Sequence, residues 1–352
     1  MDIERKLDLI LRDPTEEVIT RDELRSLLET NDCPIAYDGF EPSGLAHLGS
    51  GVLRAIKLQD MLDAGVRFKL LVADWFGWIN GKMGGDLEAL KIAGLYLVEA
   101  WHACGVNTKK VDVVWTSAMV DNQQYWQRVI QVAKATTVER ALRCSTIMGR
   151  KEGEMQYTAQ LLYPLMQAAD PFELGVDICQ LGMDQRKATM LTREVGEKLG
   201  WGKPVCVHHH LLAGLQGARM GSDIIEAKMS KSVKGSAIFI HDSEEEIKDK
   251  MSKAFCEPKL VEGNPVLEIC RYIIFRKKSE FSIERPSKFG GTVEYHSYND
   301  LEKDYRDGKV HPMDLKNSVS ISLNEVLQPM REHFIAGSQR ELYEKVKSRV
   351  TR

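Results

Sequence analysis

Short apolar runs alternate with amphipathic stretches along the first two-thirds of this chain, and that alternation limits its fold more than any other feature. Helices are expected over 52–62 and 91–104, because apolar residues recur there at helical spacing and a glycine follows each stretch. Four runs have the length and composition of buried strands: 68–73, 111–115, 176–179 and 204–207. Strands that alternate with helices form a parallel sheet, so this part is predicted to be an α/β domain.

The pattern changes after about residue 240. Ser243 and Glu246 have the spacing of a helix capping box, and apolar residues then recur every four positions. The remainder is predicted to be mostly helical, so we expect two domains, 1–237 and 238–352, in this chain of 352 residues. The stretch 331–352, with six Lys or Arg against three Glu, is interpreted as a solvated helix.

Composition narrows the class of protein. Hydrophobic residues make up 43% and charged residues 28%, and no run of about eighteen apolar residues is present that could span a membrane. The first ten residues lack the apolar core of a signal peptide. Seven scattered cysteines without a CxxC pair argue against disulfides and structural zinc, so we expect a cytoplasmic protein without a bound structural metal. A net charge of −3 excludes nucleic-acid binding by bulk charge alone.

A glycine-rich segment, 39–50, lies between an expected strand and the 52–62 helix. Gly39, Gly44 and Gly49 would let the backbone approach a ligand closely, and the helix start offers N–H groups to a phosphate. His47 could donate a hydrogen bond to charge that develops on a phosphoryl group. By itself, a turn of this kind is more often a plain loop.

A second segment, 228–232, reads Lys-Met-Ser-Lys-Ser and has glycines on both sides. Lys228 and Lys231, with Ser230 and Ser232, suit a triphosphate whose charge changes during a reaction. The alternative is a solvated basic loop. A near-copy at 250–253 lies within the expected capped helix, with its methionine on the apolar stripe, and is interpreted as structural.

Together the two segments resemble the HIGH and KMSKS motifs of class I aminoacyl-tRNA synthetases, with His47-Leu48-Gly49-Ser50 as the first motif. The resemblance implies a Rossmann-like catalytic domain followed by a mostly α-helical anticodon-binding domain. It also implies ATP with Mg²⁺ as substrate and His47, Lys228 and Lys231 as catalytic residues. The implied ATP-binding residues are Gly39, His47, Gly49, Ser50, Asp184, Lys228, Met229, Ser230, Lys231 and Ser232. The motif usually ends in histidine where this chain has Ser50.

A helix is expected over 157–170, with apolar side chains on nearly every face. Tyr163, Gln167 and Asp170 share one stripe of it, and a buried polar stripe must meet partners. Pro164 is expected to kink this helix and Pro171 to end it. Judged from the spacing alone, the stripe is more often part of a structural hydrogen-bond network.

The pattern Tyr-x3-Gln-x2-Asp, followed by Gly-Met-Asp-Gln at 182–185, resembles tyrosyl-tRNA synthetases of the archaeal and eukaryotic type, and the similarity extends from about 36 to 316. By this resemblance, Tyr37 and Asp170 would hydrogen-bond the phenol of L-tyrosine. Tyr163, Gln167 and Gln185 would hold its α-amino group, and Asp184 would accept from the ATP ribose. A homodimer is also implied, with its interface in the connective region of about 110–150.

Three further matches concern tRNA(Tyr). Arg143, Arg186 and Lys187 resemble residues that recognise the first acceptor-stem base pair, although Arg186 and Lys187 could instead be surface charges at a helix start. Phe289, His311 and Asp314 resemble the residues that bind the first anticodon base, by stacking and by accepting from guanine. The alternative there is a buried aromatic ring and a helix cap at Asp314.

Two other interpretations remain open. A tryptophanyl-tRNA synthetase shares the fold and both motifs, but an indole has no use for a Tyr37 and Asp170 pair that binds a hydroxyl. A non-catalytic RNA-binding paralogue would not require the residues of both motifs. The run 208–210, three consecutive histidines, is interpreted as a strand end on the surface, because neighbouring strand residues point to opposite faces and rarely share one metal ion.

Overall fold

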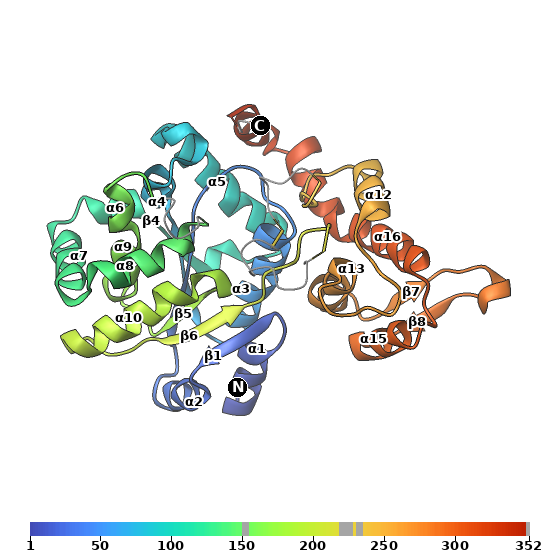
Figure 1. Cartoon of the computed structure of the whole chain (residues 1–352), viewed down its shortest axis with the longest axis horizontal. Coiled ribbons are helices and arrows are strands. Elements are labelled where there is room, and N and C mark those ends of the chain that lie inside the picture. Colours follow the sequence, from blue (N-terminus) through green and yellow to red (C-terminus); the bar gives the residue numbers. More distant parts are fainter. Residues whose placement is uncertain (150–154, 218–227, 230–234, 350–352) are drawn as a thin grey trace.

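The structure is a computed structural model that describes residues 1–149, 155–217, 228–229 and 235–349 (Figure 1). Its main sheet has the strand order β1-β6-β5-β2-β3-β4. The neighbouring pairs are parallel except that β1 runs antiparallel to β6. The strand bounds are β1 Thr15–Ile19, β2 Ile35–Phe40, β3 Arg67–Val72, β4 Val111–Trp115, β5 Ile178–Gly182 and β6 Val205–His209. The predicted α/β class with a parallel sheet is confirmed, and β4 has the predicted bounds.

Helices cover both faces of this sheet (Figure 1). Alternate strand residues face opposite sides, so Leu70 joins one cluster of buried side chains and Leu71 the other. The first cluster includes α1, α2, α3 and α5, and the second includes α4 and α6 to α10. The bounds are α1 Ile3–Leu11, α2 Arg21–Thr30, α3 Arg54–Asp63, α4 Asp74–Ile79, α5 Leu87–Ala103, α6 Thr116–Val120, α7 Gln123–Ala135, α8 Val138–Cys144, α9 Ala159–Leu174 and α10 Arg186–Leu199.

Helix α9 corrects one prediction about proline. Pro171 does not end this helix, which continues to Leu174 and stops at Gly175 with a φ of 61°. A proline inside a helix removes one backbone hydrogen bond, and its fixed φ is itself helical. Both Pro164 and Pro171 are buried, so packing on every side holds the helix together across them.

The chain from 238 onwards is mostly helical, as predicted, with one two-stranded hairpin. Ser243 and Glu246 form the predicted capping box at the start of α12. Met251 is buried while Lys250 pairs with Asp242, so the near-copy at 250–253 is structural. The bounds are α12 Glu244–Lys253, α13 Pro265–Ile269, α14 Phe275–Lys277, β7 Phe281–Ile283, β8 Val293–Tyr295, α15 Tyr298–Arg306, α16 Pro312–Arg331 and α17 Arg340–Arg349.

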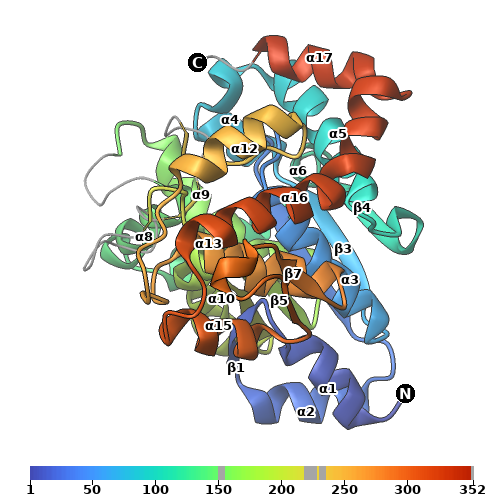
Figure 2. The ribbon, with the colours of Figure 1, turned by 90° about the vertical axis from the view of Figure 1, so that its right-hand side faces the viewer.

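Helix α17 is not the fully solvated helix that was expected for the end of the chain. It lies against α5 at the top of the molecule (Figures 1 and 2), and its Tyr343 and Val346 are buried. The charged residues of α17 therefore occupy one face only, and the other face packs against α5.

A buried ion-pair cluster also joins the two parts of the chain. Asp60, on α3, is 1% exposed and pairs with Arg12 and with Arg276, the latter at 2.7 Å. Beside it the fully buried Lys57 donates to the Ile10 carbonyl at 2.5 Å, and burial lowers the pKa of Lys57 to about 7.

Among the described helices, none has the length and apolar character that a membrane span requires.

Candidate active site

A cavity of about 490 Å³ opens at the carboxyl ends of the central strands, between the two signature segments. Ligands usually bind at this edge of a parallel sheet, and the volume is in the range of small-molecule sites. The predicted residues that line the cavity are Tyr37, Gly39, His47, Gly49, Ser50, Tyr163, Gln167, Asp170, Asp184, Gln185, Lys228 and Met229. Ser230, Lys231 and Ser232 lie outside the described residues.

His47 and Gly49 define the geometry of the first signature segment. Nδ1 of His47 accepts from the Gly49 N–H at 3.2 Å, so in the neutral ring the proton is carried by Nε2. A Cβ at Gly49 would lie only 3.2 Å from the His47 ring, a tight contact that would require the ring to shift. The segment leads into a π-helical turn, Gly49–Leu53, and then into α3.

Ser50, the residue that departs from the family motif, supports the backbone of this turn. Its hydroxyl accepts from the His47 N–H at 3.0 Å, and its carbonyl accepts from Nε1 of Trp101 at 2.9 Å. The Ser50 residue is 7% exposed and lines the cavity. The local role of its side chain is therefore to hold His47 in place.

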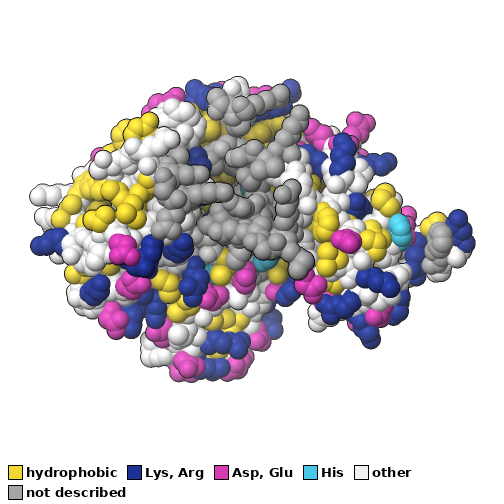
Figure 3. All heavy atoms as spheres, viewed as in Figure 1, with side chains coloured by type: hydrophobic (Ala, Val, Ile, Leu, Met, Phe, Trp, Pro, Cys, Tyr) yellow, Lys and Arg dark blue, Asp and Glu magenta, His cyan; other side chains and the backbone are white. Residues whose placement is uncertain are grey.

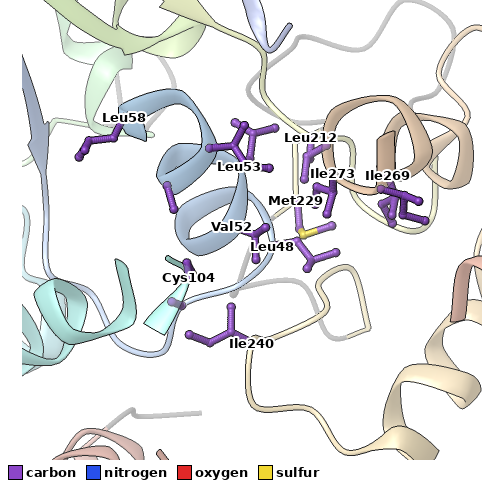
Figure 4. Packing of buried hydrophobic residues seen from close by; sticks show 14 of the residues in the cluster. Leu48, Val52, Leu53, Leu58, Cys104, Leu212, Met229, Ile240, Ile269 and Ile273 are labelled. Carbon is purple, nitrogen blue, oxygen red and sulfur yellow. The ribbon is translucent and has the colours of Figure 1, made fainter. Parts of the chain in front are cut away.

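Of the second signature segment the structure describes Lys228 and Met229, and Met229 packs in the same buried cluster as Leu48 of the first. Lys228 donates from Nζ to Oδ2 of Asp184 at 2.6 Å, across the cavity. Burial alone would raise the pKa of Asp184, but the Lys228 ammonium holds it below its usual value. Met229 donates its N–H to the Leu212 carbonyl at 2.6 Å, and its side chain lies beside Leu48 (Figure 4). The two segments thus share one packed core.

One end of the cavity holds a tyrosine and a carboxyl group in a buried setting. Tyr37, on β2, and Asp170, on α9, are each 1% exposed. Tyr125 donates its hydroxyl to Oδ1 of Asp170 at 2.9 Å. Burial raises the pKa of Asp170 to about 8 even though this hydrogen bond lowers it. This end offers both a donor and an acceptor to a ligand hydroxyl.

Polar groups of α9 and its neighbours form the next part of the wall. Tyr163 donates its hydroxyl to Oε1 of Glu41 at 2.5 Å, and Asn80 donates to both oxygens of the same carboxyl group at 3.1 and 3.2 Å. Gln167 donates to Oε1 of Gln185 at 3.0 Å. The predicted stripe on α9 thus faces the cavity and its partners, and this grouping of oxygen acceptors suits an ammonium group.

Four residues of this site were missed from the sequence: Glu41, Asn80, Tyr125 and Arg54. Glu41 lies within the first signature segment, where a carboxylate in a glycine-rich turn was the available signal. Arg54 donates from one nitrogen to both oxygens of Asp38 at 2.9 Å and stacks on Phe40. Tyr125 and Asn80 have no sequence spacing that connects them with their partners.

Comparison with known proteins gives this geometry a family. The pattern of the family described as "tRNA synthetases class I (W and Y)" matches residues 29–328. A tyrosine–tRNA ligase from Thermococcus kodakarensis is 47% identical over 95% of this chain and 96% of its own length. The relative named "Tyrosine–tRNA ligase 1, cytoplasmic" from Arabidopsis thaliana is 44% identical over 97% of this chain and 89% of its own. The chain belongs to the tyrosine–tRNA ligase family of class I synthetases.

A solved structure agrees with this membership. The tyrosyl-tRNA synthetase of Pyrococcus horikoshii, solved with L-tyrosine, has a TM-score of 0.92 and 43% identity and covers 99% of this chain and 100% of its own. The family expected from the sequence is therefore confirmed, in preference to the tryptophan branch and to a non-catalytic paralogue. This tyrosine–tRNA ligase family member is an aminoacyl-tRNA synthetase that uses ATP.

The three consecutive histidines require a correction. His208 and His209 are buried, 0% and 1% exposed, and are not on the surface as expected. His208 contacts Glu17 of β1 and Thr189 of α10, each at 2.9 Å, and His209 contacts Gln180 of β5 at 2.7 Å. His210 lies between Glu16 and Glu268, whose carboxylates raise its pKa to about 9 against the opposing effect of burial. Among the described residues, no group of three or more His, Cys, Asp or Glu is placed to hold a metal ion.

The residues predicted to contact the acceptor stem lie close together on the surface. Arg143, on α8, and Lys187, at the start of α10, are exposed on neighbouring helices. Arg186 is also exposed but pairs with Glu17 at 2.8 Å, a contact expected of a surface charge. None of the three lines the cavity, and Arg143 also has an acidic neighbour, Glu139 at 3.8 Å.

The predicted anticodon-binding residues occupy two connected segments. Phe289 ends a short turn, Ser287–Phe289, and His311 is the cap of α16. Arg285 donates to the Gly291 carbonyl at 2.7 Å and to the Lys309 carbonyl at 2.8 Å, which ties the two segments together. The alternative that Asp314 caps the helix is wrong, because His311 accepts from the Met313 N–H in that position.

We expect the buried carboxyl group of Asp170 to make stability depend on pH. The folded protein holds a proton there up to about pH 8, whereas the unfolded chain releases it near pH 4, so this group's contribution to the free energy of unfolding falls as pH rises between these values. Asp170→Asn removes this effect. The free energy of unfolding of the variant, taken relative to that of the native protein, should therefore rise by on the order of 3 kcal/mol between pH 5 and pH 8.

Urea unfolding at both pH values measures this difference, with the surface variant Asp300→Asn as the control that should show no such gain. If the native protein and Asp170→Asn differed in the free energy of unfolding by the same amount at pH 5 and pH 8, the raised pKa of the buried Asp170 would be contradicted.

Proposed function

We propose that this protein activates tyrosine with ATP and transfers it to the 3′-terminal adenosine of tRNA(Tyr), for protein synthesis. The observation that carries the proposal is one cavity whose buried end holds Tyr37 and Asp170. Its lining also includes His47 and Gly49 of the first signature segment and Lys228 and Met229 of the second. A substrate phenol could donate to the Asp170 carboxyl group while it accepts from Tyr37. Phenylalanine would offer neither of these hydrogen bonds.

The rest of the cavity has groups for each remaining part of the substrates. Tyr163, Gln167 and Gln185 would hold the α-amino group, and Glu41 supplies negative charge behind Tyr163. Asp184, whose Oδ1 has no hydrogen-bond partner among the described residues, would accept from the ATP ribose. These contacts would place the tyrosine carboxylate next to the α-phosphorus of ATP.

In the first step the carboxylate attacks the α-phosphorus, the bond to the bridging oxygen breaks, and pyrophosphate leaves as tyrosyl-adenylate forms. Little covalent chemistry falls to the protein, so positioning and charge stabilisation by His47, Lys228 and Lys231 carry the rate. Nε2 of His47 can donate to the phosphoryl oxygens, because Nδ1 accepts from Gly49. ATP enters as its Mg²⁺ complex, and the metal belongs to the substrate. In the second step the ribose hydroxyl of the tRNA displaces AMP.

For Lys228 this proposal includes an exchange of partners. Its ammonium pairs with Asp184 at 2.6 Å. A ribose that donates to Asp184 would compete with this pair and make the lysine available to the triphosphate. The Asp184 carboxylate would therefore position the lysine at the cavity as well as accept from the ribose.

We also propose the tRNA contacts and the division into 1–237 and 238–352. Arg143, Arg186 and Lys187 would meet the acceptor stem beside the cavity. Phe289, His311 and Asp314, in the second domain, would bind the anticodon. In support, Arg285 hydrogen-bonds to the segment that follows Phe289 and to the segment that precedes His311. The residues proposed for the acceptor stem lie on two neighbouring helices. A cytoplasmic location is inferred from the Arabidopsis relative's name.

A homodimer is proposed through the connective region of about 110–150. Large hydrophobic side chains are exposed there, with Ile130 at 53% and Val138 at 70%. Figure 3 shows such side chains gathered on the left of the molecule, over α6 to α9. An apolar surface of this kind usually marks an interface.

Two aspartate variants test the function. Asp170→Ala should lower tyrosine-dependent ATP–pyrophosphate exchange by roughly 100-fold or more, because it removes one partner of a buried polar pair. Asp314→Ala should leave exchange unchanged and lower the kcat/KM of tRNA charging by roughly 10- to 100-fold, as loss of one base contact does. Exchange and charging are measured on the same preparations. If Asp314→Ala abolished exchange, the assignment of the second domain would be wrong.

The dimer is tested by a matched pair of charge substitutions. Ile130→Glu should shift the mass measured by analytical ultracentrifugation from dimer towards monomer, because it places a charge in an apolar interface. Ile321→Glu, at a residue equally exposed at 53% but in the second domain, should leave the dimer intact. A native monomer, or dissociation by Ile321→Glu alone, would contradict the proposed interface.

A further inference from the structure

Helix α5 holds the first signature segment from both ends. The Tyr96 hydroxyl accepts from the Ala46 N–H at 3.0 Å, one residue before His47. Trp101, further along the same helix, donates from Nε1 to the Ser50 carbonyl at 2.9 Å. Tyr96 is 0% and Trp101 2% exposed, so neither hydrogen bond competes with bulk water. The four residues that include His47 are thus fixed between two side chains of one rigid element.

The segment that follows the lysine motif is bound to the same turn. The Leu48 N–H donates to the Ile238 carbonyl at 2.9 Å, and the Ile240 N–H donates to the Ala46 carbonyl at 3.1 Å. The Ile240 side chain lies below Val52 and Leu48 (Figure 4). A shift of this segment would therefore move the backbone on both sides of His47.

His241, the next residue, connects the segment with Tyr96. Its Nε2 lies 2.9 Å from the Tyr96 hydroxyl, which already accepts from Ala46 and can donate its own proton to the ring. Burial lowers the pKa of His241 to about 3, with a smaller effect from Lys347, so the ring is neutral at physiological pH and can accept that proton. The chain Ala46, Tyr96, His241 is thus one continuous buried hydrogen-bond network.

The C-terminal helix closes the cluster from outside. Tyr343, on α17, stacks on His241 with ring centres 4.5 Å apart and planes at 28°. The ring of Phe334 packs against both His241 and Tyr96, with its centre 5.0 Å from the His241 ring centre and 5.1 Å from that of Tyr96. The orientation of the His241 ring, and with it the hydrogen bond to Tyr96, is set by residues more than 90 positions further along the chain.

We propose that Tyr96 and His241 are positioning residues for the activation step, and that Tyr343 on the C-terminal helix holds them in place. The inference rests on the proposed function and adds a role for α17, whose residues do not line the cavity. Without the hydroxyl of Tyr96, the Ala46 N–H and Nε2 of His241 would both lose a partner inside the protein. The turn would then relax, and His47 would lose its position relative to the α-phosphorus.

Tyr96→Phe tests this role, because it removes one oxygen and keeps the ring. We expect kcat of tyrosine-dependent ATP–pyrophosphate exchange to fall roughly tenfold or more. KM for tyrosine should stay within about twofold, because Tyr37 and Asp170 bind the substrate without contact to Tyr96. A purely structural role would lower the midpoint of thermal unfolding and leave kcat of the folded fraction at the native value.

Two variants of α17 complete the experiment. Tyr343→Phe keeps the stacked ring and should behave as the native protein, whereas Tyr343→Ala should lower kcat in the manner of Tyr96→Phe. Because the hydrogen-bonded atoms are intact in Tyr343→Ala, this pair decides the question even if Tyr96→Phe does not fold. As a conservative rescue, His241→Gln can still accept from Tyr96 and should retain more activity than His241→Leu.

The outcomes separate this inference from the function on which it rests. If the native protein shows no exchange with tyrosine, the proposed function is wrong. If the native protein exchanges and folded Tyr96→Phe and Tyr343→Ala keep its kcat, the positioning role is wrong. If KM for tyrosine rose by the same factor by which kcat fell, the inference would also be overturned, since this result would indicate general damage to the cavity.

Discussion

Four carboxyl groups are withdrawn from water around one cavity, and each therefore needs a donor that the fold supplies. Tyr125 serves Asp170, while Tyr163 and Asn80 serve Glu41. The other two are paired with cations, Asp38 with Arg54 and Asp184 with Lys228. Because a buried acid without its partner would cost free energy, the donors fix the positions of α7, α9 and the lysine segment around the cavity. Oδ1 of Asp184 keeps no hydrogen-bond partner among the described residues.

The parallel sheet is what brings these groups together. Tyr37 and Asp38 lie on β2, and Asp184 follows its neighbour β5. Residues about 145 positions apart therefore meet at one edge, while α9 crosses that edge with its polar stripe. Lys228 and Met229 reach this edge through backbone pairing with Leu212 and Ala213, and residues 238–240 pair with the turn that contains His47. Tyr96 and His241 extend the network outwards to α17, so the end of the chain supports its first signature segment.

The sequence predicted those features that depend on local periodicity or on a contiguous motif. Strand β4, the capping box of α12 and the stripe of Tyr163, Gln167 and Asp170 all follow from spacing within one element. Features that depend on distant partners were missed or wrong. The buried His208 meets Glu17 of β1, nearly 200 positions earlier, and Tyr125 meets Asp170 from another helix. Pro171 stays inside α9 because packing outweighs the loss of one hydrogen bond. Neither the periodicity of apolar residues nor a contiguous motif predicts such contacts between distant residues.

The most direct test of the account is ATP–pyrophosphate exchange with each of the twenty amino acids, in the absence of tRNA. The account predicts exchange with tyrosine alone, because Tyr37 and Asp170 require a hydroxyl at the buried end of the cavity. Exchange with phenylalanine or tryptophan at a similar rate would contradict the assigned recognition while it left the adenylate chemistry intact. Absence of exchange with every amino acid, from protein shown to be folded, would contradict the catalytic role itself.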